Sequence, residues 1–187
     1  NYDIGHVFST GGGGVAGLSV VCVTGQKARG VTGRSVPIGD PFDIDYVAHE
    51  MGHQLGANHT FSYENESTGV QVEPGSGTTI MGYAGVADPV SLNIQDNSDP
   101  YFTYRSILQI QNNLATKTCP VSTPITNSPP LVNAGLDFTV PSGTAYVLRG
   151  AASDANGDSL AYCWEQNNSA TGSQSGSSSI ASATKPS

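Results

Sequence analysis

The segment from His49 to His59 constrains the fold of this chain more than any other. It reads His-Glu-Met-Gly-His-Gln-Leu-Gly-Ala-Asn-His and holds three of the four histidines in the sequence. At about 100° per residue of an α-helix, His49 and His53 lie about 40° apart on one face. Glu50 stands one position further round, where it can reach a zinc-bound water without ligating the metal. This spacing predicts a zinc site on a helix.

The residues before and after this segment also favour a helix, because they are typical of helix ends. Asp40 before Pro41 is typical of an N-cap followed by proline in the first turn. Gly56 is predicted to end the helix, because glycine takes a left-handed bend without strain. The chain can then fold back and present His59 as a third ligand. Three neutral nitrogens leave the ion an open position for water, as a catalytic zinc requires.

The remaining residues of the helix predict which face is buried. The apolar positions fall within about 100° of one another, opposite the histidines. They are Ile44, Val47, Ala48, Met51 and Leu55. We expect the helix to bury this stripe and to turn its imidazoles toward a cleft. His6 stands alone in the sequence and is more typical of an ordinary core or surface histidine.

A second segment adds a family resemblance. Residues 77–83 read Gly-Thr-Thr-Ile-Met-Gly-Tyr. After the pattern H-E-x-x-H-x-x-G-x-x-H, this segment resembles the methionine-containing turn of the metzincin zinc peptidases. The resemblance implies that Met81 forms an apolar floor under the histidines. In the astacin and serralysin branches a tyrosine at the place of Tyr83 can touch zinc or the oxyanion of the reaction, whereas the reprolysin branch generally lacks it. Packing under the cleft is the alternative for Tyr83.

The segment before the helix narrows the resemblance. Residues 3–22 resemble the region of the reprolysins in which a Gly-Leu-Ala-type edge strand leads to a cysteine. Residues 15–23 have strand composition, and residues 11–14 are expected to form a flexible glycine loop at the rim of the cleft. The resemblance implies that substrate adds to the edge strand as an antiparallel strand. The residues of that strand are Val15, Ala16, Gly17 and Leu18.

The chain is therefore identified as resembling a reprolysin-like (adamalysin-type) metzincin zinc metallopeptidase of the bacterial secreted type, over residues 1–119. In that family the cysteine after the edge strand is joined to one after the last helix. The resemblance thus implies a disulfide between Cys22 and Cys119, with two reduced, buried cysteines as the alternative. The last helix is expected at residues 104–115. Cys163 is left over, either buried as a small apolar residue or paired outside this sequence.

Charge and composition limit the partners and the location expected for this protein. The net charge of −8 makes nucleic acid a poor partner, and no stretch approaches the roughly 20 apolar residues of a membrane span. The many Gly, Ser, Thr and Asn residues and a plausible disulfide indicate a secreted, extracellular protein. Metzincin catalytic domains usually carry more sheet and helix before the zinc motif. We therefore expect the missing N-terminal segment of the precursor to be a partner of this chain.

The organisation changes after Cys119. Residues 120–130 form a Pro-rich linker. Strand-like runs follow at 137–140, 145–148 and 160–165, and Tyr162-Cys163-Trp164 resembles a strand of bacterial Ig-like or PKD-like modules, in which the tryptophan packs between two sheets. The fold class expected is α+β: a metzincin domain over 1–119, then a truncated all-β Ig-like sandwich over 131–187. Its last twenty residues are expected to be loop or disordered.

Calcium is a further cofactor that the sequence allows. Carboxylate and amide oxygens alternate in two clusters, as hard ligands for this ion can. Solvated turn residues are the alternative reading in both places. The clusters are Asp154, Asn156 and Asp158, and Asp96, Asn97 and Asp99.

The resemblance implies hydrolysis of peptide bonds in protein or peptide substrates. Zinc is held by the three histidines of residues 49–59, and Glu50 takes the proton of the attacking water. Two other functions stay open: a catalytically silent zinc-binding module, and an adhesion module of a larger secreted protein.

Overall fold

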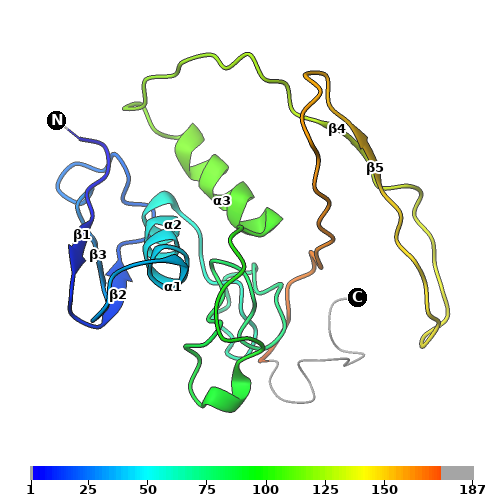
Figure 1. Cartoon of the computed structure of the whole chain (residues 1–187), viewed down its shortest axis with the longest axis horizontal. Helices are drawn as coiled ribbons and strands as arrows, with labels where there is room; N and C mark the ends of the chain where they lie inside the picture. Colours follow the sequence, from blue (N-terminus) through cyan, green and yellow to red (C-terminus); the bar gives the residue numbers. More distant parts are fainter. Residues whose placement is uncertain (1, 174–187) are drawn as a thin grey trace. The chain divides into compact units, whose positions relative to one another are not determined.

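The computed structural model describes residues 2–173 of the 187-residue chain. The chain divides into two compact units, one within Asn1–Pro120 and Glu165–Ser187 and the other at Val121–Trp164. Its elements, shown in Figure 1, are β1 (Val7–Ser9), β2 (Gly13–Ala16), β3 (Gly30–Gly33), α1 (Asp40–Phe42), η1 (Asp43–Ala48), α2 (His49–Leu55), η2 (Val90–Leu92), α3 (Tyr104–Ala115), β4 (Leu131–Asn133) and β5 (Ala151–Ser153).

The first unit begins with a three-stranded sheet in the order β1-β3-β2. β1 runs parallel to β3, and β2 runs antiparallel to it. Within the described residues β2 is therefore an edge strand. Gly13 and Gly14 belong to β2, so the expectation of a loop through residues 11–14 is wrong for its second half. Gly14 pairs with Thr32 of β3 in a regular register.

The strand predicted for residues 15–23 is also too long, because β2 ends at Ala16. Beyond that residue the chain turns, with left-handed backbone at Ser19 (φ 59°) and Cys22 (φ 62°). The amide of Ser19 donates to the carbonyl of His53 at 2.9 Å. The amide of Val21 likewise donates to the carbonyl of Gln54 at 3.1 Å. Ser19 and Val21 therefore bond the end of a helix rather than a neighbouring strand, which strand composition alone does not reveal.

The zinc-motif helix is built from α1, η1 and α2 in direct succession. Its N-cap is Gly39, at φ 73°, and not Asp40 as predicted. A backbone at this φ suits glycine better than aspartate, so Asp40 becomes the first helical residue. Gly56 ends the helix in the left-handed conformation at φ 118°, which confirms the predicted stop. Its amide donates to the carbonyl of Gly52 at 2.9 Å.

The buried face of α2 differs from the prediction. Ile44 and Ala48 of the preceding η1 do pack against the core cluster of Ala57, Ile80 and Met81, but all five positions of the predicted apolar stripe are only half-buried. The reason is that α2 packs against β2 and β3 as well as α3, so its polar side is enclosed too. The buried residues of α2 are His49, Glu50, Gly52 and Gln54.

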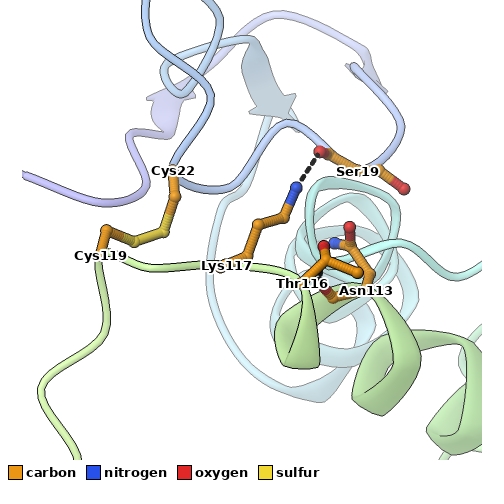
Figure 2. The surroundings of a disulfide bond; sticks show 6 residues. All are labelled: Ser19, Cys22, Asn113, Thr116, Lys117 and Cys119. Carbon is orange, nitrogen blue, oxygen red and sulfur yellow. Dashed lines mark hydrogen bonds between the residues drawn. A yellow bond between two sulfur atoms is a disulfide. The ribbon is translucent and has the colours of Figure 1, made fainter.

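The last helix of this unit, α3, has the predicted bounds of Tyr104–Ala115. A disulfide joins Cys22 to Cys119, with their Cα atoms 6.0 Å apart, which is the pairing that the family resemblance implied. Figure 2 shows Lys117 beside it, where its Nζ donates to the carbonyl of Ser19 at 3.3 Å. From α3, Asn113 Nδ2 donates to the carbonyl of Leu55 at 2.6 Å. These contacts connect α3 to the segments around α2.

The second unit contains one two-stranded antiparallel sheet of β4 and β5. The three runs predicted as strands hold no strand, and Trp164 is 48 % exposed rather than enclosed between sheets. The predicted turn does follow β5, where the amide of Gly157 donates to the carbonyl of Asp154 at 3.3 Å. The Ig-like sandwich and the domain boundaries therefore stay predictions. Most of the expected disordered tail lies outside the described residues.

Two smaller expectations can be compared with the structure. Cys163 is a free, exposed cysteine, so the expectation that it is buried is wrong. Among residues 2–173, no helix has the length and apolar character needed to cross a membrane.

Candidate metal centre

The structure brings the three histidines of the motif together. His49 and His53 come from α2, and His59 comes from the segment that follows the bend at Gly56. The Nε2 atom of His53 lies 3.2 Å from that of His49 and 3.0 Å from that of His59. Each histidine offers one nitrogen to a group whose members all lie within 4.8 Å of one another, close enough to hold one metal ion.

The opposite ring nitrogens decide which atoms face the metal. His49 Nδ1 donates to the carbonyl of Ile80 at 2.7 Å, and His53 Nδ1 donates to the carbonyl of Ala57 at 2.8 Å. A carbonyl oxygen can only accept, so both Nδ1 atoms carry the proton. The Nε2 atoms are then left with lone pairs, which are the ligands that a metal needs.

His59 is oriented by a charged partner. Its Nδ1 donates to Glu66 Oε1 at 2.9 Å. This contact places the third Nε2 lone pair toward the other two. A carboxylate on the far nitrogen of a ligand histidine fixes the ring and raises the basicity of the nitrogen that binds the metal.

The histidines are held in their neutral form. Burial, together with the neighbouring imidazoles, lowers the pKa of His49 from 6.5 to about 3, and burial lowers the pKa of His59 to about 3 as well. Burial also lowers the pKa of His53. Three neutral nitrogens with lone pairs facing one another repel unless a cation lies between them. The donor set therefore fits zinc, which three histidines bind in catalytic sites.

Glu50 lies at the start of α2, against the edge strand. A Cβ atom on Gly14 would lie 2.7 Å from Glu50 Cγ and 2.8 Å from Glu50 Cδ. Only glycine therefore leaves room for this carboxylate. Burial raises the pKa of Glu50 from 4.5 to about 7. In the absence of a metal ion the carboxyl group therefore exchanges a proton near neutral pH.

Met81 lies on the other side of α2 and is fully buried. A Cβ atom on Gly52 would lie 2.5 Å from Met81 Sδ, so the absence of a side chain at position 52 lets the methionine pack against the helix. The carbonyl of Met81 accepts from the amide of Thr60 at 3.0 Å. This bond ties the Met81 turn to the residue after His59.

An aromatic wall borders the histidines. The ring centroid of Tyr83 lies 4.6 Å from that of His59 and 5.6 Å from that of His49. Phe61 stacks on His59 with centroids 4.8 Å apart, and Tyr63 lies 4.6 Å from Phe61. Burial raises the pKa of Tyr83, so its hydroxyl stays a proton donor.

The predicted edge-strand residues are divided between two kinds of structure. Val15 and Ala16 lie in β2, whereas Gly17 and Leu18 follow it. The amide of Gly17 still donates to the carbonyl of Arg29 at 2.8 Å. His6 lies outside the metal group, with its ring nitrogens 2.7 Å from Gln54 Oε1 and 2.7 Å from Thr32 Oγ1, as expected of an ordinary histidine.

Sequence reasoning missed several residues of this site. Phe61 and Tyr63 alternate with His59 in the sequence His-Thr-Phe-Ser-Tyr, and that period of two is a signal that could have identified one aromatic face. Glu66 and the buried Glu73 gave no comparable signal, because an isolated carboxylate in a loop is most often solvated.

The calcium prediction has no support beyond the sequence. Asp154 Oδ1 accepts from the amides of Asn156 at 2.8 Å and Asp158 at 3.1 Å, and Asn156 Oδ1 accepts from the amide of Ser128 at 2.8 Å. The Asp154 oxygen is thus an acceptor within the turn, and the Asn156 oxygen accepts from the linker. A calcium site here stays a prediction.

Comparison with known proteins agrees with the geometry. The family model described as "Metallo-peptidase family M12B Reprolysin-like" matches residues 1–128. No curated protein and no solved structure gives a significant match to the chain.

Proposed function

Because the chain belongs to the reprolysin-like metallopeptidase family M12B, we propose that it is a zinc-dependent endopeptidase acting on protein substrates. The observation that carries the proposal is the convergence of three Nε2 lone pairs, since each Nδ1 atom is already bonded to an oxygen of the chain. Zinc held there supplies Lewis-acid chemistry: it makes water acidic enough to ionise near pH 7 and polarises a carbonyl group.

Glu50 is the proposed general base. It takes a proton from the attacking water and returns it to the leaving amine. Two observations support this role: the carboxylate is enclosed against Gly14, and Glu50 lies on α2, the helix that also carries His49 and His53. A cation on the histidines favours the ionised form of Glu50, which is the form that can accept a proton.

Tyr83 is the proposed donor to the oxyanion. Its ring lies beside those of His49 and His59, and its raised pKa keeps the phenol protonated. A neutral hydroxyl can donate a hydrogen bond to negative charge that develops on the scissile carbonyl. Met81 is the proposed apolar floor, which fits its complete burial against Gly52.

The substrate is proposed to bind along β2. This strand has a neighbour on one side only among the described residues, and its free edge can accept an extended peptide as a further antiparallel strand. Val15 is 69 % exposed, which leaves a side chain available for contact with such a peptide. The same strand carries Gly14, so the peptide would lie next to Glu50.

The setting of the enzyme is also a proposal. The disulfide between Cys22 and Cys119 supports secretion, because such bonds persist in oxidising compartments. We propose a catalytic domain at 1–119, a linker at 120–130 and an Ig-like module beyond it.

Replacing Glu50 with glutamine tests the catalytic proposal. The parent should cleave casein in a chelator-sensitive way, whereas Glu50→Gln should lose roughly 10²–10⁴-fold in rate and keep one bound zinc per chain. Cleavage by Glu50→Gln at the parental rate would exclude Glu50 as the base. A parent that binds zinc but cleaves no protein would instead favour a silent zinc-binding module.

A further inference from the structure

Glu73 is a buried acidic residue that the proposed chemistry does not use. It is 8 % exposed and lies beside the segment that follows His59. Its amide donates to the carbonyl of Thr60 at 2.9 Å, and it forms a parallel bridge with Phe61. Burial of a carboxylate is costly unless the chain supplies hydrogen-bond donors to it, so the donors around Glu73 indicate what it does.

The carboxylate of Glu73 binds donors in two separate segments. Oε1 accepts from the amides of Thr78 at 2.9 Å and Thr79 at 3.0 Å. Oε2 accepts from the hydroxyl of Thr79 at 2.7 Å and from the hydroxyl of Thr60. One side chain therefore joins the segment after His59 to the turn that contains Met81.

One of these segments adjoins a ligand histidine in the sequence, and the other is hydrogen-bonded to a second one. Thr60 is the residue after His59. Thr79 precedes Ile80, whose carbonyl accepts from His49 Nδ1 at 2.7 Å. The carboxylate of Glu73 thus bonds Thr60, the sequence neighbour of His59. It also bonds Thr79, the sequence neighbour of Ile80, whose carbonyl orients His49.

The backbone around Glu73 is shaped to allow this contact. Gly77 has φ 72°, and a Cβ atom there would lie 3.0 Å from Glu73 Oε2. The turn can therefore wrap closely round the carboxylate only because position 77 is glycine. Thr60 and Thr79 are both buried, so water does not compete for their hydroxyl groups.

We propose that Glu73 is a positioning residue of the metal centre: its carboxylate sets the distance between the His59 segment and the Met81 turn, and zinc affinity depends on it. The inference rests on the proposed zinc site but not on peptidase activity. Residues that orient metal ligands through a hydrogen bond typically change metal affinity by about 10–100-fold when replaced.

The first test is the zinc affinity of Glu73→Gln in the full chain, measured by competition with a chromophoric chelator. Glutamine has nearly the same volume, but its amide nitrogen faces donors and cannot accept from them. We expect the dissociation constant for zinc to rise by about tenfold, the lower end of the range for direct partners of ligand histidines, because Glu73 acts through one further residue. Glu64→Gln is the matched control, because Glu64 is exposed and loses the same charge in the same loop region. Zinc affinity should change little in this control.

The second test uses the two hydroxyl groups and covers the case in which Glu73→Gln does not fold. Thr60→Ser and Thr79→Ser keep the donor, whereas Thr60→Val and Thr79→Val keep the shape and remove it. We expect the serine variants to bind zinc within about threefold of the parent and the valine variants to bind about tenfold more weakly. When Thr79→Val is added to Glu73→Gln, zinc affinity should fall little further, because the Glu73 carboxylate that accepts from the Thr79 hydroxyl is already absent.

The outcomes separate this inference from the proposed function. If the parent binds zinc and Glu73→Gln binds it equally well, Glu73 has no positioning role. The same conclusion follows if serine and valine variants have equal affinities. If the parent itself does not bind zinc, the proposed function fails instead.

Discussion

The side chain of Glu50 occupies the place where a Cβ atom of Gly14 would stand, with Glu50 Cγ only 2.7 Å from that position. A glycine in the edge strand and the proposed general base are therefore matched to each other. Because Gly14 has no side chain, Glu50 can lie directly against β2, the strand proposed to bind substrate. The distance between β2 and the proposed base therefore depends on this glycine.

Replacing Gly14 with alanine should displace Glu50. We expect kcat to fall by roughly 10²-fold, because small misplacements of a catalytic group have effects of this size, while bound zinc is retained. In a Glu50→Asp background the methyl group added at position 14 should lower kcat much less, since the shorter aspartate side chain leaves space for it. Steady-state kinetics of the four proteins form the test.

Gly12→Ala is the control for Gly14, because a Cβ atom at position 12 meets nothing within 4 Å. Its kcat should equal that of the parent. If Gly14→Ala causes equal losses in the parent and in the Glu50→Asp background, the two residues are not coupled.

Zinc binding should release a proton from Glu50. In the metal-free protein burial raises the pKa of Glu50 to about 7, so the carboxyl group is mostly protonated near pH 6. A cation on the neighbouring histidines favours the charged form and lowers this pKa. The histidines contribute little at that pH, because burial lowers the pKa of His49 and His59 to about 3.

We therefore expect release of close to one proton per zinc near pH 6, and that proton comes from Glu50. Above about pH 8 Glu50 is already ionised, and a proton released on zinc binding comes instead from the zinc-bound water. Calorimetric titration in two buffers with different ionisation enthalpies measures this number. The Glu50→Gln variant should release almost none near pH 6, and an unchanged release from it would contradict the assignment.

Glu66 should tune zinc affinity through His59. Its carboxylate accepts from His59 Nδ1 at 2.9 Å, and its side chain is 32 % exposed. Because solvent weakens such a contact, we expect Glu66→Gln to weaken zinc binding near the lower end of the usual range, about tenfold. Competition with a chelator checks this, and an increase in affinity would show that the contact does not support the ligand.

The disulfide between Cys22 and Cys119 should stabilise the first unit. It closes a loop with a sequence separation of 97 residues, for which chain entropy predicts about 3–5 kcal/mol. The urea midpoint of the parent should fall on reduction, whereas the midpoint of a Cys22→Ser/Cys119→Ser variant should not respond to a reductant.

Cys163→Ser serves as the background for both measurements, because Cys163 is the free, exposed cysteine among the described residues and could exchange with the bridge. Full stability in the reduced parent would mean that the bridge adds nothing to folding.

Local spacing explains which predictions were confirmed. Gly56 ends the helix as expected, and the bounds of α3 are as predicted, because both depend on residues within one or two turns. The N-cap was wrong, since the preceding Gly39 takes a positive φ that the pattern Asp-Pro does not reveal. The strand at residues 15–23 was wrong because its later residues bond the end of α2 instead of another strand.

The sequence by itself determined that three histidines and a glutamate lie within one short segment, and helical periodicity with a glycine bend brings those histidines together. Only the tertiary structure decided what surrounds them: Gly14 against Glu50, Glu66 on His59, and Glu73 between the His59 segment and the Met81 turn. The physical reason is that helical spacing follows from backbone geometry over a few residues. Contacts between residues distant in the sequence depend instead on how the whole unit packs, and the periodicity of a short segment does not predict them.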